Sequence, residues 1–279
     1  MSQPSPRTDW HEAIFYALQI DLKDYSHLLE YHKEYTLSAN NNRIDILIIK
    51  KQAGFQIPKH IASIFRTRNI FESKGLGISL NKNTYYKTIG HASYYINTFS
   101  NKENIDRRNI TLTFISFRYP RKLFKHLTKE CKKTIEKTYP GVYYIINDIY
   151  DTQVLVLKEL SPEDSMYLYC LQKNMNVPEM IDILINNYTA NKNNELYTKY
   201  MNQFLYSRTK GDPLMVCEGI FKLYGTSSKE IAEQARKQTK EQDDNYYLPQ
   251  IEKLKDSVNT LTSEIDSLKQ LLSQNNIAY

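Results

Sequence analysis

Residues 43–50 read RIDILIIK, and residues 69–74 read NIFESK. The first run is almost continuously apolar, which predicts a β-strand that is buried on both faces. The second run predicts another strand, and Gly75 and Gly77 are expected to end it. Because a carboxylate inside an apolar strand is costly to bury unless it is paired or binds a metal ion, Asp45 requires a partner.

The second strand supplies candidates for that partner. Side chains alternate along a strand, so Glu72 and Lys74 share one face while Phe71 and Ser73 point to the other. If the two strands are neighbours, Asp45 converges with Glu72 and Lys74. Two carboxylates and a lysine could hold a hard cation and position a water for phosphodiester hydrolysis. The structural alternative is a buried Asp45–Lys74 pair with Glu72 at the rim.

The patterns around these two strands predict a mixed α/β sheet. The expected helices are Trp10 to about Leu22, Ile61–Arg66, Thr84–Asn97 and a basic helix that begins at Pro120. The further expected strands are Tyr31–Leu37, Thr111–Ser116, Gly141–Ile146 and Gln153–Leu157. We assign residues 1–160 to this sheet-containing domain.

No strand pattern follows Leu157, so residues 161–248 are expected to form a helical module. Ser161-Pro162 gives its first helix an N-cap and a proline at the first helical position. In residues 249–279, apolar residues repeat every seven positions at Ile251, Val258, Ile265 and Leu272, with Leu254, Leu261 and Leu268 between them. β-Branched residues at one seam position and leucine at the other favour a parallel two-stranded coiled coil, and hence a homodimer through residues 251–272. The alternative is a helix packed on its own domain.

The positive charge of the chain is local. The net charge is +6, and residues 118–137 hold eight Lys/Arg against Glu130 and Glu136, which is +6 in that stretch alone. Such a patch attracts polyanions, of which nucleic acid is the commonest. Its candidate DNA contacts are Arg118, Arg121, Lys122 and Lys125, together with Lys87 on the 84–97 helix. The alternative is an ordinary solvated helix face.

Several classes of protein are disfavoured by composition. No apolar run approaches the roughly 18 residues of a membrane-spanning helix, and residues 1–9 lack the apolar core of a secretory signal. Cys131, Cys170 and Cys217 are odd in number and widely spaced, which is typical of idle thiols in a reducing cytoplasm. The six histidines show no zinc-ligand spacing and are expected to be surface or satisfied core residues. We therefore expect a cytoplasmic protein with no membrane partner.

The order of the elements resembles the PD-(D/E)XK nuclease superfamily, and most closely its bacterial transposase-associated, recombination-promoting branch. The segments that carry the resemblance are Trp10-His11 through Asp21, Arg43–Lys50, Ile64 through Lys74, Tyr86-Lys87 with Gly90, and Arg118–His126. They span about residues 10–160. The resemblance implies a restriction-endonuclease-like mixed sheet flanked by helices and a DNA endonuclease that depends on Mg²⁺ or Mn²⁺.

The motif of that superfamily assigns roles to three residues of this chain. It implies that Asp45 and Glu72 are metal ligands and that Lys74 is the catalytic lysine. Members often add a carboxylate from the first helix. Glu12 is explained by helix capping and Asp21 by an exposed helix end, and Asp21 is preferred as the third ligand.

Two other functions compete with a nuclease. One is a catalytically inactive DNA- or partner-binding protein that retains the fold, and the other is a coiled-coil adaptor whose N-terminal domain binds protein. The intact Glu72-Ser73-Lys74 sequence favours the nuclease over the inactive fold, because drift is not expected to spare polar residues on buried strands. The basic patch disfavours the adaptor.

Overall fold

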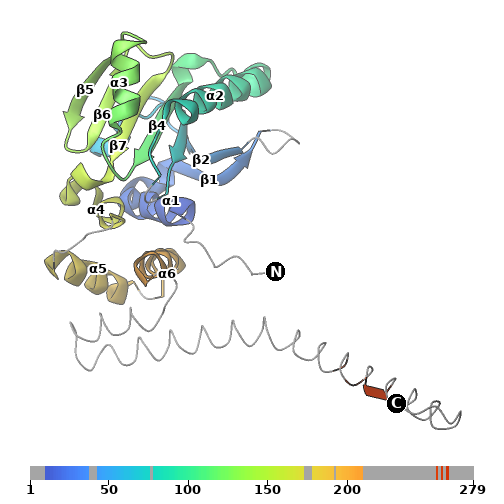
Figure 1. Ribbon diagram of the computed structural model, residues 1–279, viewed down its shortest axis with the longest axis vertical. Coiled ribbons are helices and arrows are strands. Elements are labelled where there is room, and N and C mark those ends of the chain that lie inside the picture. Colours follow the sequence, from blue (N-terminus) through green and yellow to red (C-terminus); the bar gives the residue numbers. More distant parts are fainter. Residues whose placement is uncertain are drawn as a thin grey trace, which may run out of the picture. The chain divides into compact units, whose positions relative to one another are not determined.

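A computed structural model describes residues 10–37, 43–75, 78–172, 178–191 and 193–209, and four single residues near the C-terminus. Its centre is a mixed seven-stranded sheet with the order β1-β2-β3-β4-β7-β6-β5 (Figure 1). The strands are β1 Leu29–Thr36, β2 Arg43–Lys50, β3 Arg68–Ser73, β4 Ile110–Ser116, β5 Thr134–Tyr139, β6 Val142–Ile146 and β7 Asp151–Val156. The expected mixed α/β sheet is confirmed.

The strand directions decide which ends meet. Strands β3, β4 and β7 are parallel, whereas β1, β2, β6 and β5 join the sheet in antiparallel pairs. The carboxyl ends of β3 and β4 therefore lie side by side, at the edge where β2 begins. This edge brings the polar residues of three strands together, as open sheets commonly do at a binding site.

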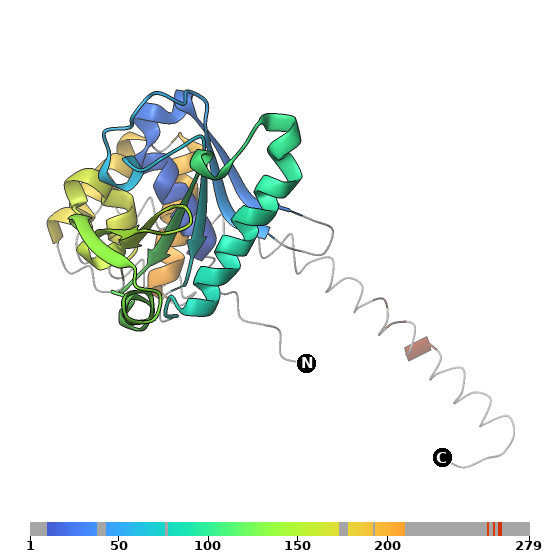
Figure 2. The same cartoon turned by 90° about the horizontal axis from the view of Figure 1, so that it is seen from above.

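Helices cover both faces of the sheet (Figures 1 and 2). The helices are α1 Trp10–Asp21, α2 Lys82–Glu103, α3 Arg121–Lys129, α4 Pro162–Cys170, α5 Pro178–Ala190 and α6 Glu195–Thr209, and the 3₁₀ turns are Lys23–Leu28, His60–Ala62, Arg107–Asn109 and Leu157–Glu159. One core joins α1, α4 and α6 to one face, and the other joins α2 and α3 to the opposite face. The result is a three-layer α/β/α arrangement.

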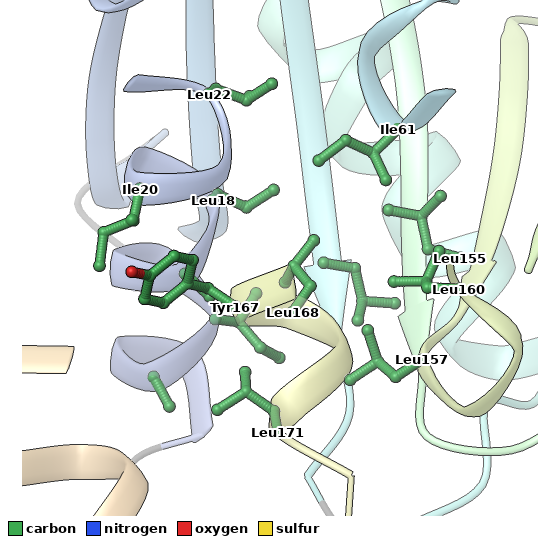
Figure 3. Close-up of a cluster of buried hydrophobic side chains, with 14 of the residues drawn as sticks. Leu18, Ile20, Leu22, Ile61, Leu155, Leu157, Leu160, Tyr167, Leu168 and Leu171 are labelled. Carbon is green, nitrogen blue, oxygen red and sulfur yellow. The ribbon is translucent and has the colours of Figure 1, made fainter. Parts of the chain in front are cut away.

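The core under α1 explains why the helices after residue 160 belong with the sheet. Figure 3 shows Leu18 of α1 and Leu168 of α4 facing Leu155 and the rest of the sheet. Tyr200 of α6 is also fully buried there, and its hydroxyl donates to the Tyr167 carbonyl at 2.8 Å. The boundary expected at residue 160 is thus not a break in packing. Met1–Asp212 forms one compact unit, and Pro213–Tyr279 forms a second.

Two elements differ from the sequence expectations. Strand β5 was not expected, because Thr134–Tyr139 carries Glu136 and Lys137 and follows a basic helix; both of these residues are exposed, as is typical of an edge strand. The helix expected at Ile61–Arg66 is only the 3₁₀ turn His60–Ala62.

The coiled-coil seam lies outside the described residues. Within that segment the structure describes Asp256, Asn259, Thr262 and Ser263, which are helical and exposed, and none of them belongs to the seam. In the described part of the chain, no helix has the length and apolar character needed to cross a membrane.

Candidate metal centre

The register of β2 and β3 brings Asp45 and Glu72 together. Ile46 lies opposite Phe71, and continuing this antiparallel register by one residue sets Asp45 opposite Glu72. Opposite residues of an antiparallel pair share a face, with Cβ atoms about 5 Å apart. The convergence that the sequence predicted for these two carboxylates is therefore a property of the strand pairing.

Glu72 is the most deeply buried acid of the group. Its side chain is 2% exposed, and Lys74 Nζ donates to its Oε1 at 2.6 Å. Burial, followed by the negative charge of Asp45, raises the pKa of Glu72, while the charges of Lys74 and Lys87 oppose this shift. A buried carboxylate whose ionised form is disfavoured by a neighbouring carboxylate is stabilised in that form by a bound cation.

Asp45 is held by α1 and by the end of β3. Its Oδ2 accepts from the Ser73 amide at 2.9 Å and lies 3.1 Å from His11 Nδ1. Burial alone would raise the pKa of Asp45, but the hydrogen bond and charge of His11 and the bond from Ser73 hold it below its ordinary value. The proposed Asp45–Lys74 pair with a peripheral Glu72 is therefore wrong, because Lys74 pairs with Glu72 and Glu72 is buried.

Helix α2 adds positive charge on the side of Glu72. Lys87 is exposed on α2, and its positive charge lowers the pKa of Glu72. His91 lies one turn further along α2 and is 7% exposed. Burial, followed by the charge of Lys87, lowers the pKa of His91, whereas the charge of Asp45 raises it. Lys87 therefore contributes positive charge that acts on both Glu72 and His91.

Trp10 packs beside the end of β3. Its ring packs edge-on against Phe117 with centroids 4.9 Å apart, and a Cβ atom added to Gly75 would lie 2.8 Å from the indole. This close approach fixes the start of α1, and with it His11, beside Asp45. Gly75 was expected only as a strand terminator, and the tertiary contact with Trp10 gives it a second role.

The third carboxylate expected from α1 does not join the pair. Asp21 is ten residues after His11, about 15 Å along the helix axis, and its two oxygens accept from the amides of Tyr167 and Leu168 in α4 at 3.0 and 2.9 Å. It is buried rather than at an exposed helix end, and burial raises its pKa to about 7. Asp21 therefore fastens α4 to α1, and it leaves the proposed ligand set.

Glu12, the other acidic candidate of α1, is also engaged elsewhere. It pairs with Lys33 of β1 and accepts from Gln203 Nε2 of α6 at 2.8 Å. Among the described residues, no group of three or more His, Cys, Asp or Glu side chains is arranged to hold a metal ion. A centre built on Asp45 and Glu72 alone would fit Mg²⁺, because this ion commonly keeps several waters and binds through one or two carboxylates.

Arg118, Arg121, Lys122 and Lys125 form an exposed surface that we call the basic face. It begins just after β4 and continues along α3, whose Leu123, Phe124 and Leu127 are buried on the opposite side. No ion pair involves these four cations within the described part of the chain.

Two lysines of the same stretch are neutralised. Lys133 pairs with Asp148, and Lys137 pairs with Glu159 at 3.0 Å. The unpaired positive charge of residues 118–137 is therefore smaller than the net charge counted from the sequence. The unpaired cations begin at the edge of the sheet that carries Glu72.

Sequence reasoning missed His11 at this site. The six histidines were judged by their spacing, whereas His11 reaches Asp45 through the packing of α1 on the sheet, which spacing does not encode. Comparison of the chain with protein-family models, curated proteins and solved structures finds no match.

Proposed function

We propose that the chain is a metal-dependent DNA endonuclease of the PD-(D/E)XK type that hydrolyses phosphodiester bonds. Asp45 and Glu72 would hold Mg²⁺ or Mn²⁺, and Lys74 would position the attacking water. The observation that carries the proposal is the meeting of a buried Glu72, its partner Lys74 and the opposite Asp45 at one edge of the sheet.

The roles follow from charge and position. When bound, the cation polarises a phosphate and lowers the pKa of its water. Lys74 is a quarter exposed, so its ammonium can reach from Glu72 toward a phosphate oxygen and stabilise negative charge that develops there. His11 and the Ser73 amide keep Asp45 ionised and oriented.

The experiment is nicking of supercoiled plasmid with Mg²⁺ or Mn²⁺, with a chelated reaction as control. We expect Lys74→Ala to retain cation binding, measured by calorimetry, while the nicking rate falls by about 10²-fold. The cation site would survive because Lys74 is not a ligand. Lys158→Ala, which removes an exposed lysine, is the matched control and should keep the wild-type rate.

The alternative is a catalytically inactive fold that binds DNA or a protein partner. A wild-type chain that binds DNA but never cuts it, with either cation, would favour that alternative. Cutting that persists in Asp45→Ala would show that the site lies on other residues.

The basic face is proposed to bind DNA through its phosphates rather than its bases, because it is rich in lysine and shows no pattern for reading bases. Replacing Arg121, Lys122 and Lys125 by Ala should weaken binding to all DNA sequences and lower the salt slope of log K by about 2–3. Replacing Lys51 and Arg107, which are exposed at the opposite edge of the sheet, is the control. An unchanged affinity for the triple variant would make the basic face an ordinary solvated surface.

We also propose a homodimer through residues 251–272, from their seven-residue apolar repeat. Light scattering should give twice the chain mass for the full chain and the chain mass for a variant that ends at Asn245. A monomeric full chain would exclude this dimer.

A further inference from the structure

A cavity of about 240 Å³ opens beyond the carboxyl end of β4. Residues 78–80 and 116–122 line it. Arg118, Arg121 and Lys122 of this lining are exposed cations of the basic face, and none of the described lining residues is acidic. The cavity is therefore suited to an anionic ligand.

The cavity adjoins the candidate metal centre. The backbone amide of Lys74 donates to the Ile115 carbonyl at 3.3 Å, and Ser116 of the lining is the next residue of β4. The parallel register that pairs Ser73 with Ile115 places Ser116 next to Lys74, about one strand spacing of 5 Å away. Ile78, another lining residue, is tied to the end of β3, because its amide donates to the Gly75 carbonyl at 3.0 Å.

The lining combines positive charge with a fixed, exposed aromatic ring. Tyr119 is 42% exposed, and its ring is held edge-on by Phe124 and Tyr143, with centroids 5.0 and 5.3 Å away. Ile78, which also lines the cavity, is 60% exposed. Cations along a groove together with an accessible aromatic ring are the features that bind unpaired nucleotides, because every base has a stacking face.

The volume of the cavity limits the class of ligand further. A cavity of about 240 Å³ has room for one base or sugar, but a base that remains paired within a duplex is not free to enter it. A strand whose phosphate lies at Glu72 and Lys74 would carry its neighbouring nucleotide to the mouth of the cavity.

We propose that this cavity binds an unpaired nucleotide next to the scissile phosphate, so that the substrate is DNA with single-stranded or unpaired character, including the unpaired regions that supercoiling opens in a plasmid, rather than a fully paired duplex. The inference rests on the proposed nuclease function and names its substrate class. Tyr119 acts as the stacking surface, and Arg118, Arg121 and Lys122 hold the flanking phosphates.

The test is fluorescence anisotropy of the full chain in chelator, with one labelled oligonucleotide used as a single strand and as its blunt duplex. Tyr119→Ala should weaken single-strand binding by about 5-fold or more while duplex binding changes less than about 2-fold. Tyr119→Phe keeps the ring and should bind as the wild type does. Tyr94→Ala, which removes an exposed tyrosine of α2, is the matched control.

A substitution that fills the cavity tests the same inference while Tyr119 and the rings packed against it stay unchanged. Ser79 is exposed on the cavity wall, so Ser79→Trp should fold normally and block the cavity, with the same selective loss of single-strand binding. If both Tyr119→Ala and Ser79→Trp bind the single strand as the wild type does, or weaken both DNA forms equally, the inference is overturned. Plasmid nicking measured in parallel separates the two claims, because nicking that depends on Glu72 would still support the nuclease when the cavity has no selectivity.

Discussion

Replacing Glu72 by Gln is expected to lower the rate of Mg²⁺-dependent plasmid nicking by about 10³-fold. The substitution keeps the shape of the side chain but removes the charge that a cation needs, and that interaction is worth several kcal/mol in the transition state. Lys74 would also lose the carboxylate that holds its ammonium 2.6 Å away. Initial rates at saturating Mg²⁺ measure the effect.

Glu103→Gln is the matched control for this substitution. Glu103 pairs with Arg68 at the far end of α2, so its replacement removes an acid and an ion pair without touching the proposed ligands. Thermal unfolding of both variants shows whether the fold is intact. A folded Glu72→Gln variant that nicks DNA at the wild-type rate would contradict the assignment of Glu72 as a ligand.

Asp21→Asn is expected to remove a large pH dependence of stability. Burial raises the pKa of Asp21 from 3.8 to about 7, so between these values the folded chain keeps a proton that the unfolded chain has lost. The stability that this group contributes is complete below about pH 4 and is lost as the pH rises through 7. Between pH 5 and pH 8 the wild type should therefore lose about 2–3 kcal/mol more unfolding free energy than Asp21→Asn does.

Urea unfolding at both pH values measures this difference. The same variant should nick plasmid within about 2-fold of the wild-type rate, because Asp21 lies about 15 Å from the start of α1 and bonds only to α4 amides in the described structure. Equal pH dependence of the two proteins would mean that Asp21 does not titrate as its burial implies.

The central strands and their polar residues were predictable from the sequence because both depend on local pattern. The apolar run around Asp45 predicts a buried strand, and the alternation of side chains sets Glu72 and Lys74 on one face. The pairing of β2 with β3 then places Asp45 opposite Glu72. This part of the site required no knowledge of distant packing.

The remaining features depend on contacts between distant parts of the chain. The sequence could not show that Asp21 is not a metal ligand, because the amides that donate to it belong to Tyr167 and Leu168. These residues lie 146 and 147 positions further along the chain. His11 gains its role only when Trp10 packs over Gly75. Of the helical module expected at residues 161–248, the structure describes α4, α5 and α6, and residues 210–248 lie outside the described residues. The docking of these helices on α1 follows from apolar faces whose partners the sequence does not specify.

The most direct test of the metal centre is a crystal of the full chain grown with Mn²⁺ and examined for its anomalous signal. The proposed function predicts a peak about 2.1 Å from a carboxylate oxygen of Asp45 and of Glu72, with no peak at Asp21. A Mn²⁺ peak elsewhere in the chain, with Asp45 and Glu72 free of metal, would contradict the proposed centre.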